Sequence, residues 1–290
     1  SHVSVMCLKN PLVYILVFLL CSATLSCIGV SKDKTIKEEP DMHDSIAREQ
    51  SLLVSDDEME NANRYNHRAD ELFDDFLYVY IHDKDVQLQR TLFPIKERLI
   101  DGSTHTINKD MWHDALDFMN NEYTTTIYGD IQDKGINENT SLENASVERI
   151  DLLKTVLTSY DFIKDNGKWN LKEIRNMSFN DCDLRDFLFF YSKFSQDSSY
   201  QRRALAKSIR ISMLDPEDDT QIIEGFINRE QWSTINNGVP GGIISNIRYG
   251  QQYNNAKSIL MEKVSIGNGM SETFYFAKNK NKWELVGYEN

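Results

Sequence analysis

The sequence has few cysteines: Cys7, Cys21 and Cys27 lie within the first 27 residues, and only Cys182 lies further along. If the N-terminal segment is removed on export and Cys27 is acylated, Cys182 keeps the one remaining thiol and no internal disulfide can form. We interpret Cys182 as an ordinary packed residue. The fold must then depend on its hydrophobic core, for which an apolar content of 40% is sufficient.

Basic residues are also scarce. Without residues 1–27 the chain has 31 Lys and Arg against 45 Asp and Glu, a net charge of −14. A protein that binds nucleic acid needs a basic surface to neutralise phosphates. The chain has neither such a patch nor a recognition motif, so we exclude nucleic acid as a partner.

Histidine is too sparse to indicate a metal site. The sequence has six histidines; the last three are His82, His105 and His113, and none follows His113. A metal site needs two or more ligands at a regular spacing with a carboxylate partner, whereas His105 and His113 are eight residues apart across an expected element boundary. We predict neither a metal nor a cofactor, and no local signature assigns a catalytic residue.

A long apolar run occurs only at the start of the chain. Residues 6–27 read MCLKNPLVYILVFLLCSATLSC, with one lysine in front and small residues before Cys27, which is typical of an export signal. The TLSC segment, residues 24–27, resembles a bacterial lipobox, although Leu is usual where Thr24 stands. We therefore predict a signal peptide over residues 1–27 with lipidation at Cys27. An uncleaved transmembrane anchor is the alternative, and either reading places the rest of the chain outside the inner membrane.

Residues 28–66 are polar, show little periodicity and contain no aromatic residue before Tyr65. Such a composition cannot bury enough apolar surface to fold. We predict that this segment is a disordered tether between the lipid and a folded part.

The folded part contains an internal repeat. The fragments NKDMW and NREQW, at 108–112 and 228–232, are separated by 120 residues, and YG at 128–129 recurs at 249–250, a separation of 121. A separation of 114 relates several further pairs: Phe73 and Phe187, Phe76 and Phe190, Tyr80 and Phe194, Asp83 and Asp197, Gln87 and Gln201, Phe162 and Phe276, Trp169 and Trp283, and Leu171 and Leu285. An ordered series of this kind indicates tandem duplication. We predict two domains, 67–176 and 177–290, each with its own sheet and meeting near residues 176–183.

Each copy follows the same order of elements. Apolar residues at 72, 73, 76, 77 and 80 predict an amphipathic helix, and residues 111–119 a second short helix. Alternating strands over 159–164 and 168–174, joined by DNG, predict a hairpin, and residues 272–278 and 282–288 predict its counterpart, preceded by a strand at 258–266. Helices followed by an antiparallel sheet define an α+β architecture.

This order, with a closing Lys-Trp-x-Leu strand in each copy, resembles the nuclear transport factor two-like, or SnoaL-like, cone fold. The whole pattern is similar to a family of uncharacterised lipoproteins from Gram-negative gut anaerobes whose domain has no assigned function. The resemblance implies two tandem cone-shaped domains with helices packed on a curved antiparallel sheet. The second copy departs from the first because it has no counterpart to LFP at 92–94.

The repeat also separates scaffold from candidate site. Equivalent residues in both copies are best explained by folding, so we interpret Asp83, Asp197, Gln87 and Gln201 as helix-end residues, and Trp169 and Trp283 as core residues of the closing strands. The candidate pocket-lining residues are Trp112, Tyr128, Tyr160, Trp232 and Tyr249, with a place in the core as the alternative for Trp112 and Trp232. Some cone-fold enzymes use an acid/base and a Tyr inside the cone, for which the candidates are Asp161, Tyr160, Tyr128 and His113.

We therefore expect a non-catalytic cell-envelope lipoprotein, anchored to a membrane through its N-terminal lipid and facing the periplasm or the cell surface. Its cones would bind an unknown small ligand or an envelope protein. A structural subunit of an envelope complex and a cone-fold enzyme of the isomerase or hydrolase type are the alternatives. An open apolar cavity would favour the binding role. A closed cone with an exposed apolar patch would favour the assembly role, and converging ionisable groups would favour an enzyme.

Overall fold

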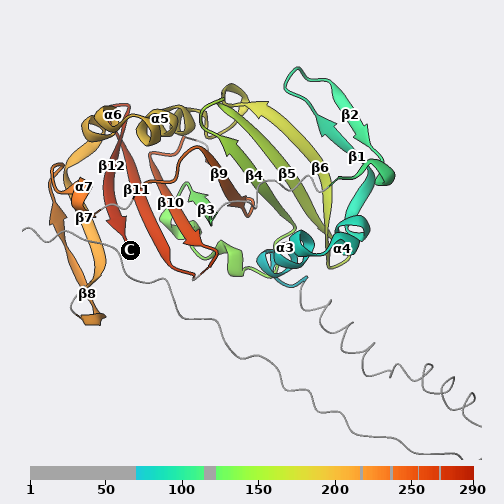
Figure 1. Cartoon of the computed structure of the whole chain (residues 1–290), viewed down its shortest axis with the longest axis horizontal. Coiled ribbons are helices and arrows are strands. Elements are labelled where there is room, and N and C mark those ends of the chain that lie inside the picture. The colour runs from blue at the N-terminus through green and yellow to red at the C-terminus, as the bar shows by residue number, and fades with distance from the viewer. Residues whose placement is uncertain (1–69, 114–121, 216–217, 236–237, 254, 268) are drawn as a thin grey trace, which may run out of the picture. The chain divides into compact units, whose positions relative to one another are not determined.

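The computed structural model describes residues 70–113, 122–215, 218–235, 238–253, 255–267 and 269–290 (Figure 1). All of them lie in one compact unit, residues 55–290. The predicted signal peptide with Cys27, the tether, and most of the short helix predicted at 111–119 lie outside the described residues. Within the described part of the chain, no helix has the length and apolar character needed to cross a membrane.

We refer to residues 70–178 as the first half and to residues 179–290 as the second half. The helices of the first half are α3 (Phe73–His82) and α4 (Lys84–Gln89), with the 3-10 turns η1 (Lys109–Met111), η3 (Ile131–Asp133) and η4 (Ile136–Glu138). Its strands are β1 (Thr91–Arg98), β2 (Thr104–Ile107), β3 (Tyr123–Tyr128), β4 (Asn144–Asp151), β5 (Val156–Asp165) and β6 (Lys168–Ser178). The second half contains η5 (Phe179–Asp181), α5 (Arg185–Gln196), α6 (Ser198–Arg203) and α7 (Trp232–Ile235), and the strands β7 (Leu205–Asp215), β8 (Asp218–Ile227), β9 (Ile243–Arg248), β10 (Ser258–Ser265), β11 (Ser271–Asn279) and β12 (Lys282–Glu289).

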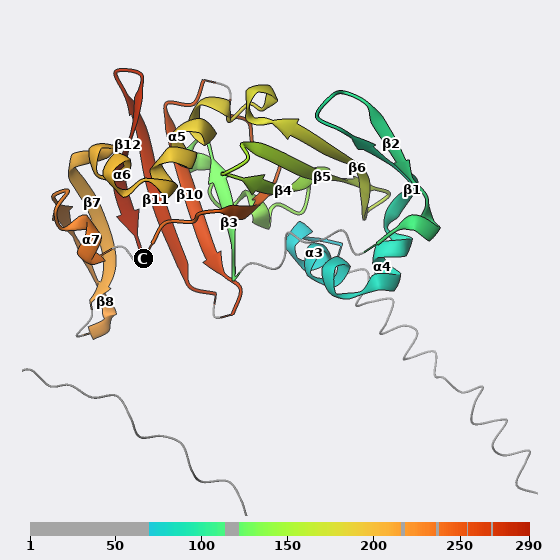
Figure 2. The same ribbon diagram turned by 45° about the horizontal axis from the view of Figure 1, so that its top comes forward.

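These strands form one sheet in the order β2-β1-β6-β5-β4-β9-β3-β10-β11-β12-β7-β8 (Figures 1 and 2). The two central strands are exchanged between the halves: β3, from the first half, pairs with β10, and β9, from the second half, pairs with β4. The prediction of two separate sheets meeting near residues 176–183 is therefore wrong. The sheet is also mixed, since β1 pairs with β6, β7 with β12 and β3 with β9 in parallel.

The predicted hairpins are confirmed. Strands β5 and β6 are joined through Asn166 and Gly167, both with positive φ (50° and 76°), and β11 and β12 through Lys280 and Asn281, with φ of 47° and 63°. Two consecutive residues with positive φ give the tight turn whose twist matches that of the flanking strands. In the first half, the asparagine and glycine of DNG supply this conformation at low steric cost.

The helix of each half packs on its hairpin through the same ring contacts. Phe73 of α3 lies 5.3 Å from Phe162 and 5.0 Å from Trp169, measured between ring centroids. In the second half, Phe187 of α5 lies 5.2 Å from Phe276 and 5.4 Å from Trp283. Trp169 is fully buried and Trp283 is 8% exposed. The separation of 114 residues seen in the sequence is thus a separation between equivalent packing positions.

The two cores lie on opposite faces of the central strands. On β4, Val147 packs in the first-half core whereas Ile150 packs in the second-half core. On β9, Ile247 belongs to the first core and Ile244 to the second. Side chains separated by an odd number of residues point to opposite sides of a strand. The core of each half therefore packs on its own face of the strands at the centre of the sheet.

The helix ends confirm the scaffold interpretation of the repeated polar residues. The carboxylate of Asp83 caps α4 by accepting from the backbone N–H of Asp85 and Val86, and Asp197 caps α6 by accepting from Ser199 and Tyr200. Gln87 and Gln201 each donate through Nε2 to a backbone carbonyl at the preceding helix end. Such caps satisfy N–H groups that have no partner inside the helix.

Candidate functional site: a polar groove behind the first half

A groove with a volume of about 490 Å³ runs along the first half, on the side of β4 and β5 turned away from α3. Alternation places it there: Val147 and Tyr160 lie in the core packed against α3, whereas their neighbours Glu148 and Asp161 line the groove. The segment between η5 and α5 and the end of β9 close its other side. The ionisable residues of its lining are Glu148, Asp161, Lys172, Glu173, Arg175, Asp181, Cys182, Asp183 and Arg248.

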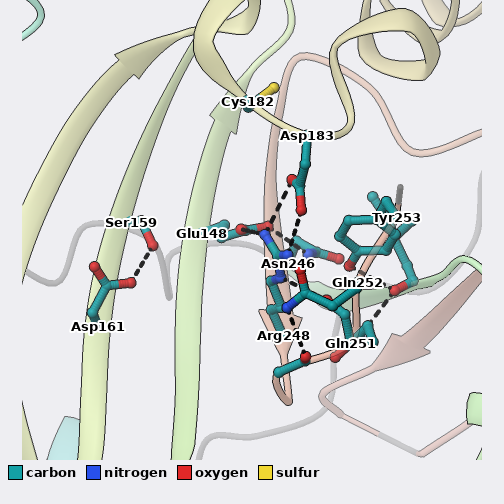
Figure 3. Close-up of polar contacts among 12 residues, drawn as sticks. Glu148, Ser159, Asp161, Cys182, Asp183, Asn246, Arg248, Gln251, Gln252 and Tyr253 are labelled. Carbon is teal, nitrogen blue, oxygen red and sulfur yellow. Dashed lines mark hydrogen bonds and ion pairs between the residues drawn. The ribbon is translucent and has the colours of Figure 1, made fainter. Parts of the chain in front are cut away.

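Arg248, the last residue of β9, links the walls of the groove (Figure 3). Its guanidinium donates to both carboxylate oxygens of Asp183, at 3.2 and 2.5 Å, and Nη1 lies 3.6 Å from Glu148 Oε1. Nε donates to the carbonyl of Gln251, and the guanidinium lies 4.7 Å from the ring centroid of Tyr253. One residue therefore connects β4 to the segment that leads into α5.

Glu148 is the buried member of this group, with 4% of its surface exposed. Its Oε2 accepts a hydrogen bond of 2.8 Å from Asn246 Nδ2. Burial raises the pKa of Glu148, because a charged carboxylate is disfavoured away from water, and Arg248 and Asn246 offset only part of this effect. Burial also disfavours the charge of Arg248, but Glu148 and Asp183 outweigh it and raise the pKa of Arg248.

A second ion pair lies at the other end of the groove. Arg175 on β6 binds both oxygens of Asp161 on β5, and Ser159 donates to the same carboxylate at 2.7 Å. The hydrogen bond to Asp161 raises the pKa of Arg175. Asp161 is an acid/base candidate from the sequence, but both of its carboxylate oxygens are occupied by the guanidinium of Arg175, so neither faces the groove as a free acceptor.

Cys182 is half-buried at the edge of the groove, with Sγ 3.2 Å from the carbonyl of Phe179. Burial, together with the charges of Asp183 and Glu148, raises the pKa of its thiol to about 12. The nucleophile in cysteine chemistry is the thiolate. A thiol that stays protonated at neutral pH fits the interpretation of Cys182 as an ordinary packed residue.

The five candidate pocket residues from the sequence are all buried, and none lines this groove. Tyr249 donates to Asp74 at 2.6 Å. Tyr128 donates to Glu262 at 3.2 Å. Burial is the first cause of the raised pKa of each of these two tyrosines.

Trp112 and Tyr160 lie in the same first-half core as Tyr249. Trp112 donates through Nε1 to Gln87 Oε1 at 3.3 Å. Trp232 lies in the second-half core, where its ring packs 5.5 Å from that of Tyr288. His113 is exposed. Within the described ranges, no three His, Cys, Asp or Glu side chains are grouped so as to hold a metal ion.

Strand register shows what the sequence reasoning missed. Tyr128 pairs with Leu260 and Arg248 pairs with Ser146. Because Leu260 and Ser146 are 114 residues apart, Arg248, not Tyr249, is the equivalent of Tyr128, and the match of the two YG fragments is one residue out of register. The slip matters because successive residues face opposite sides of a sheet.

With this register, each half has a glutamate at the same position of its central sheet. Glu148 of β4 faces Arg248, and Glu262 of β10 faces Tyr128. The two glutamates are 114 residues apart, which is the spacing of the other repeated residues. That spacing is the signal by which the sequence could have pointed to Glu148.

The fold is that of the NTF2-like class. The chain is similar to an NTF2-like protein from Bacteroides fragilis NCTC 9343 whose crystal structure is known, with 32% identity, a TM-score of 0.69, and coverage of 76% of this chain and 96% of that one. Residues 54–290 match the family described as Domain of unknown function (DUF4348), and the chain belongs to this family. No match is found among curated proteins.

Proposed function

We propose that the protein is a non-catalytic binding module of the cell envelope that takes a small cationic ligand in the polar groove. The observation that carries this proposal is the charge of the lining, where five carboxylates stand against three basic side chains. Two of the basic residues, Arg175 and Arg248, are already held by Asp161, Asp183 and Glu148. Glu173 also pairs with Arg98, at 3.3 Å, but the carboxylates still outnumber the basic side chains, and this negative charge favours a ligand with an amine or guanidinium group.

The side chains of the groove support binding rather than catalysis. A general acid or base needs an accessible group whose proton exchanges near neutral pH. Asp161 and Asp183 are each occupied by an arginine, and both oxygens of Glu148 face a donor, Asn246 or Arg248. These contacts fix the shape of the groove.

We further propose that the two halves are tandem copies of one α+β cone, and that the chain is attached to a membrane through a lipid on Cys27 and a tether of residues 28–66. The equivalent ring contacts and the equivalent glutamates support the duplication. Replacing Cys27 with serine is expected to abolish lipidation. Mass spectrometry that finds an unmodified residue upstream of Cys27 at the mature N-terminus contradicts the attachment.

The groove is tested by calorimetric titration of the folded protein with agmatine, which carries a guanidinium and an amine. We expect saturable binding at one site, and at least tenfold weaker binding in the double variant Glu173→Gln/Asp181→Asn, because both carboxylates line the groove. Asp165→Asn is the control for charge removal outside the groove, since it removes a charge at the exposed end of β5. Absence of saturation at millimolar agmatine, or equal weakening by the control, rejects the proposal.

A further inference from the structure

A second cleft, with a volume of about 690 Å³, lies in the second half between α5, α6 and the turn joining β11 to β12. Its lining has five basic residues, Arg185, Lys193, Arg203, Lys278 and Lys282, and two acidic residues, Asp186 and Glu284. The whole chain has a net charge of −13, so this excess of positive charge runs against its composition.

Most of the basic side chains in this cleft are not neutralised by the protein. Within the described part of the chain, only Lys278 of the five forms an ion pair, with Asp186 at 3.3 Å. Arg203 lies 5.9 Å from the ring centroid of Tyr200. Half-buried Phe189 and Tyr200 and the buried Phe190 add an apolar wall beside the charges. The cleft therefore offers hydrogen-bond donors and an apolar surface side by side.

In the first half, the position equivalent to this cleft is closed by the side chain of Arg90. Its guanidinium binds Asp70 at 2.6 and 3.2 Å and donates to the carbonyl of Trp169 at 3.2 Å. Asp70 also accepts from the backbone N–H of Trp169 at 3.0 Å. At a separation of 114 residues, the second half has Ala204 in place of Arg90 and Leu184 in place of Asp70.

The charges differ between the halves as well. Arg185, Lys193 and Arg203 of the second half correspond to Glu71, Val79 and Gln89 of the first. Because both halves pack equivalent rings at similar distances, 5.0 and 5.4 Å, the fold does not require these positive charges. Their gathering around an open cleft points to a ligand.

We propose that this cleft binds a small organic anion, with a phosphate, sulfate or carboxylate group held by Arg185, Arg203 and Lys282, and its apolar part against Phe189 and Tyr200. Guanidinium and ammonium groups are the usual partners of such oxyanions. The acidic net charge of the chain disfavours a polyanion such as nucleic acid. This site is separate from the groove and does not depend on the ligand proposed there.

The test uses the folded protein and calorimetric titration with phenyl phosphate, which joins an oxyanion to an apolar ring. We expect saturable binding at one site, at least tenfold weaker binding of inorganic phosphate, because it lacks the ring, and no binding of benzyl alcohol, which keeps the ring and lacks the charge. No saturation by phenyl phosphate at millimolar concentration overturns the proposal, and so does equal affinity for benzyl alcohol.

Two variants locate the binding. Lys282→Ala is expected to weaken phenyl phosphate at least tenfold, whereas the matched control Lys168→Ala, at the equivalent turn of the first half, leaves the affinity unchanged. Ala204→Arg introduces at the cleft the arginine that occupies the equivalent place in the first half. Because this variant adds positive charge, stronger binding of phenyl phosphate would indicate nonspecific electrostatic attraction and would overturn the proposal. Loss of binding means that the ligand occupies the open cleft.

Thermal melting confirms that each variant is folded. If Ala204→Arg does not fold, Arg203→Ala on the exposed surface of α6 decides in its place, with at least fivefold weaker binding expected. Equal weakening by Lys168→Ala and Lys282→Ala, or unchanged affinity in Arg203→Ala, overturns the proposal.

Discussion

The two halves have nearly the same aromatic core but differ in what surrounds it. Phe76 lies 5.8 Å from Phe162, and its equivalent Phe190 lies 5.9 Å from Phe276. Lys164 and Lys278 each place the ammonium group 5.6 Å from the ring centroid of the closing-strand tryptophan. Around these rings the first half has an ion pair that fills the space, and the second half has an open basic cleft.

The same contrast holds at the centre of the sheet. Glu148 is deeply buried and faces an arginine, whereas the side chain of Glu262 is 19% exposed and accepts from the hydroxyl of Tyr128. Residues that are equivalent in the two halves therefore indicate what the fold requires, and residues that differ indicate where each half has a surface of its own. Substitutions at both kinds of position test this division between scaffold and site.

The largest effect is expected from the two tryptophans of the closing strands. Trp169→Ala and Trp283→Ala should each lower the free energy of unfolding by about 3–5 kcal/mol, the usual cost of removing a large buried aromatic side chain. The cost should be greater for Trp169, which is fully buried, than for Trp283, which borders the cleft. Denaturant unfolding measures both, with Trp→Phe variants as milder controls. Two near-native curves would show that these residues are not core.

An intermediate effect is expected from Glu148, one of the two equivalent glutamates, and it is measured as a dependence of the free energy of unfolding on pH. Burial raises the pKa of Glu148 above its usual 4.5. A raised pKa means that the folded state favours the protonated form, so the stabilisation from this group is full below about pH 4.5 and is lost as pH rises through the folded-state pKa. A tenfold change in the acid dissociation constant corresponds to about 1.4 kcal/mol of free energy.

Glu148→Gln imitates the protonated form and removes this dependence. Between pH 7 and pH 5, the stability of the native protein should therefore rise relative to that of the variant, as measured by denaturant unfolding at each pH. Glu262→Gln, at the equivalent position of β10, is the control for the loss of a glutamate at this place in the sheet. Parallel pH profiles for the native protein and Glu148→Gln would contradict the assignment.

The smallest effect is expected at the helix caps. Asp83→Ala and Asp197→Ala should each cost about 1 kcal/mol, because each removes a side chain that accepts from two backbone N–H groups. The two losses should agree closely if the caps belong to the shared scaffold. Thermal melts of the two variants measure this, and a loss at one position only would place the other outside that scaffold.

Much of the local structure could be predicted from the sequence because it depends on local chemistry. The apolar spacing from Leu72 to Tyr80 gave α3, the DNG turn gave the β5–β6 hairpin, and the 114-residue separation matched residues that make equivalent contacts. These features follow from helix periodicity, turn conformation and packing within a short stretch of chain.

The centre of the sheet could not be predicted in the same way. Burial is high along both β3 and β9, so the pattern of either strand is compatible with more than one neighbour. The choice of β10 for β3 and of β4 for β9 depends on the assembled fold. The groove was missed for the same reason, since Glu148 and Arg248 are 100 residues apart in sequence and meet only through this pairing.

The exchange of β3 and β9 has a consequence for how the chain reaches its native state. Strand β4 obtains its neighbour β9 only after residues 243–248 have been synthesised, about a hundred residues after β4 itself. Until then, the edge of β4 is open to pairing with other chains. Long sequence separations between paired strands slow folding because loop closure must come before the contacts that stabilise it. A strand of the second half therefore completes the sheet of the first half, and the two halves become native together.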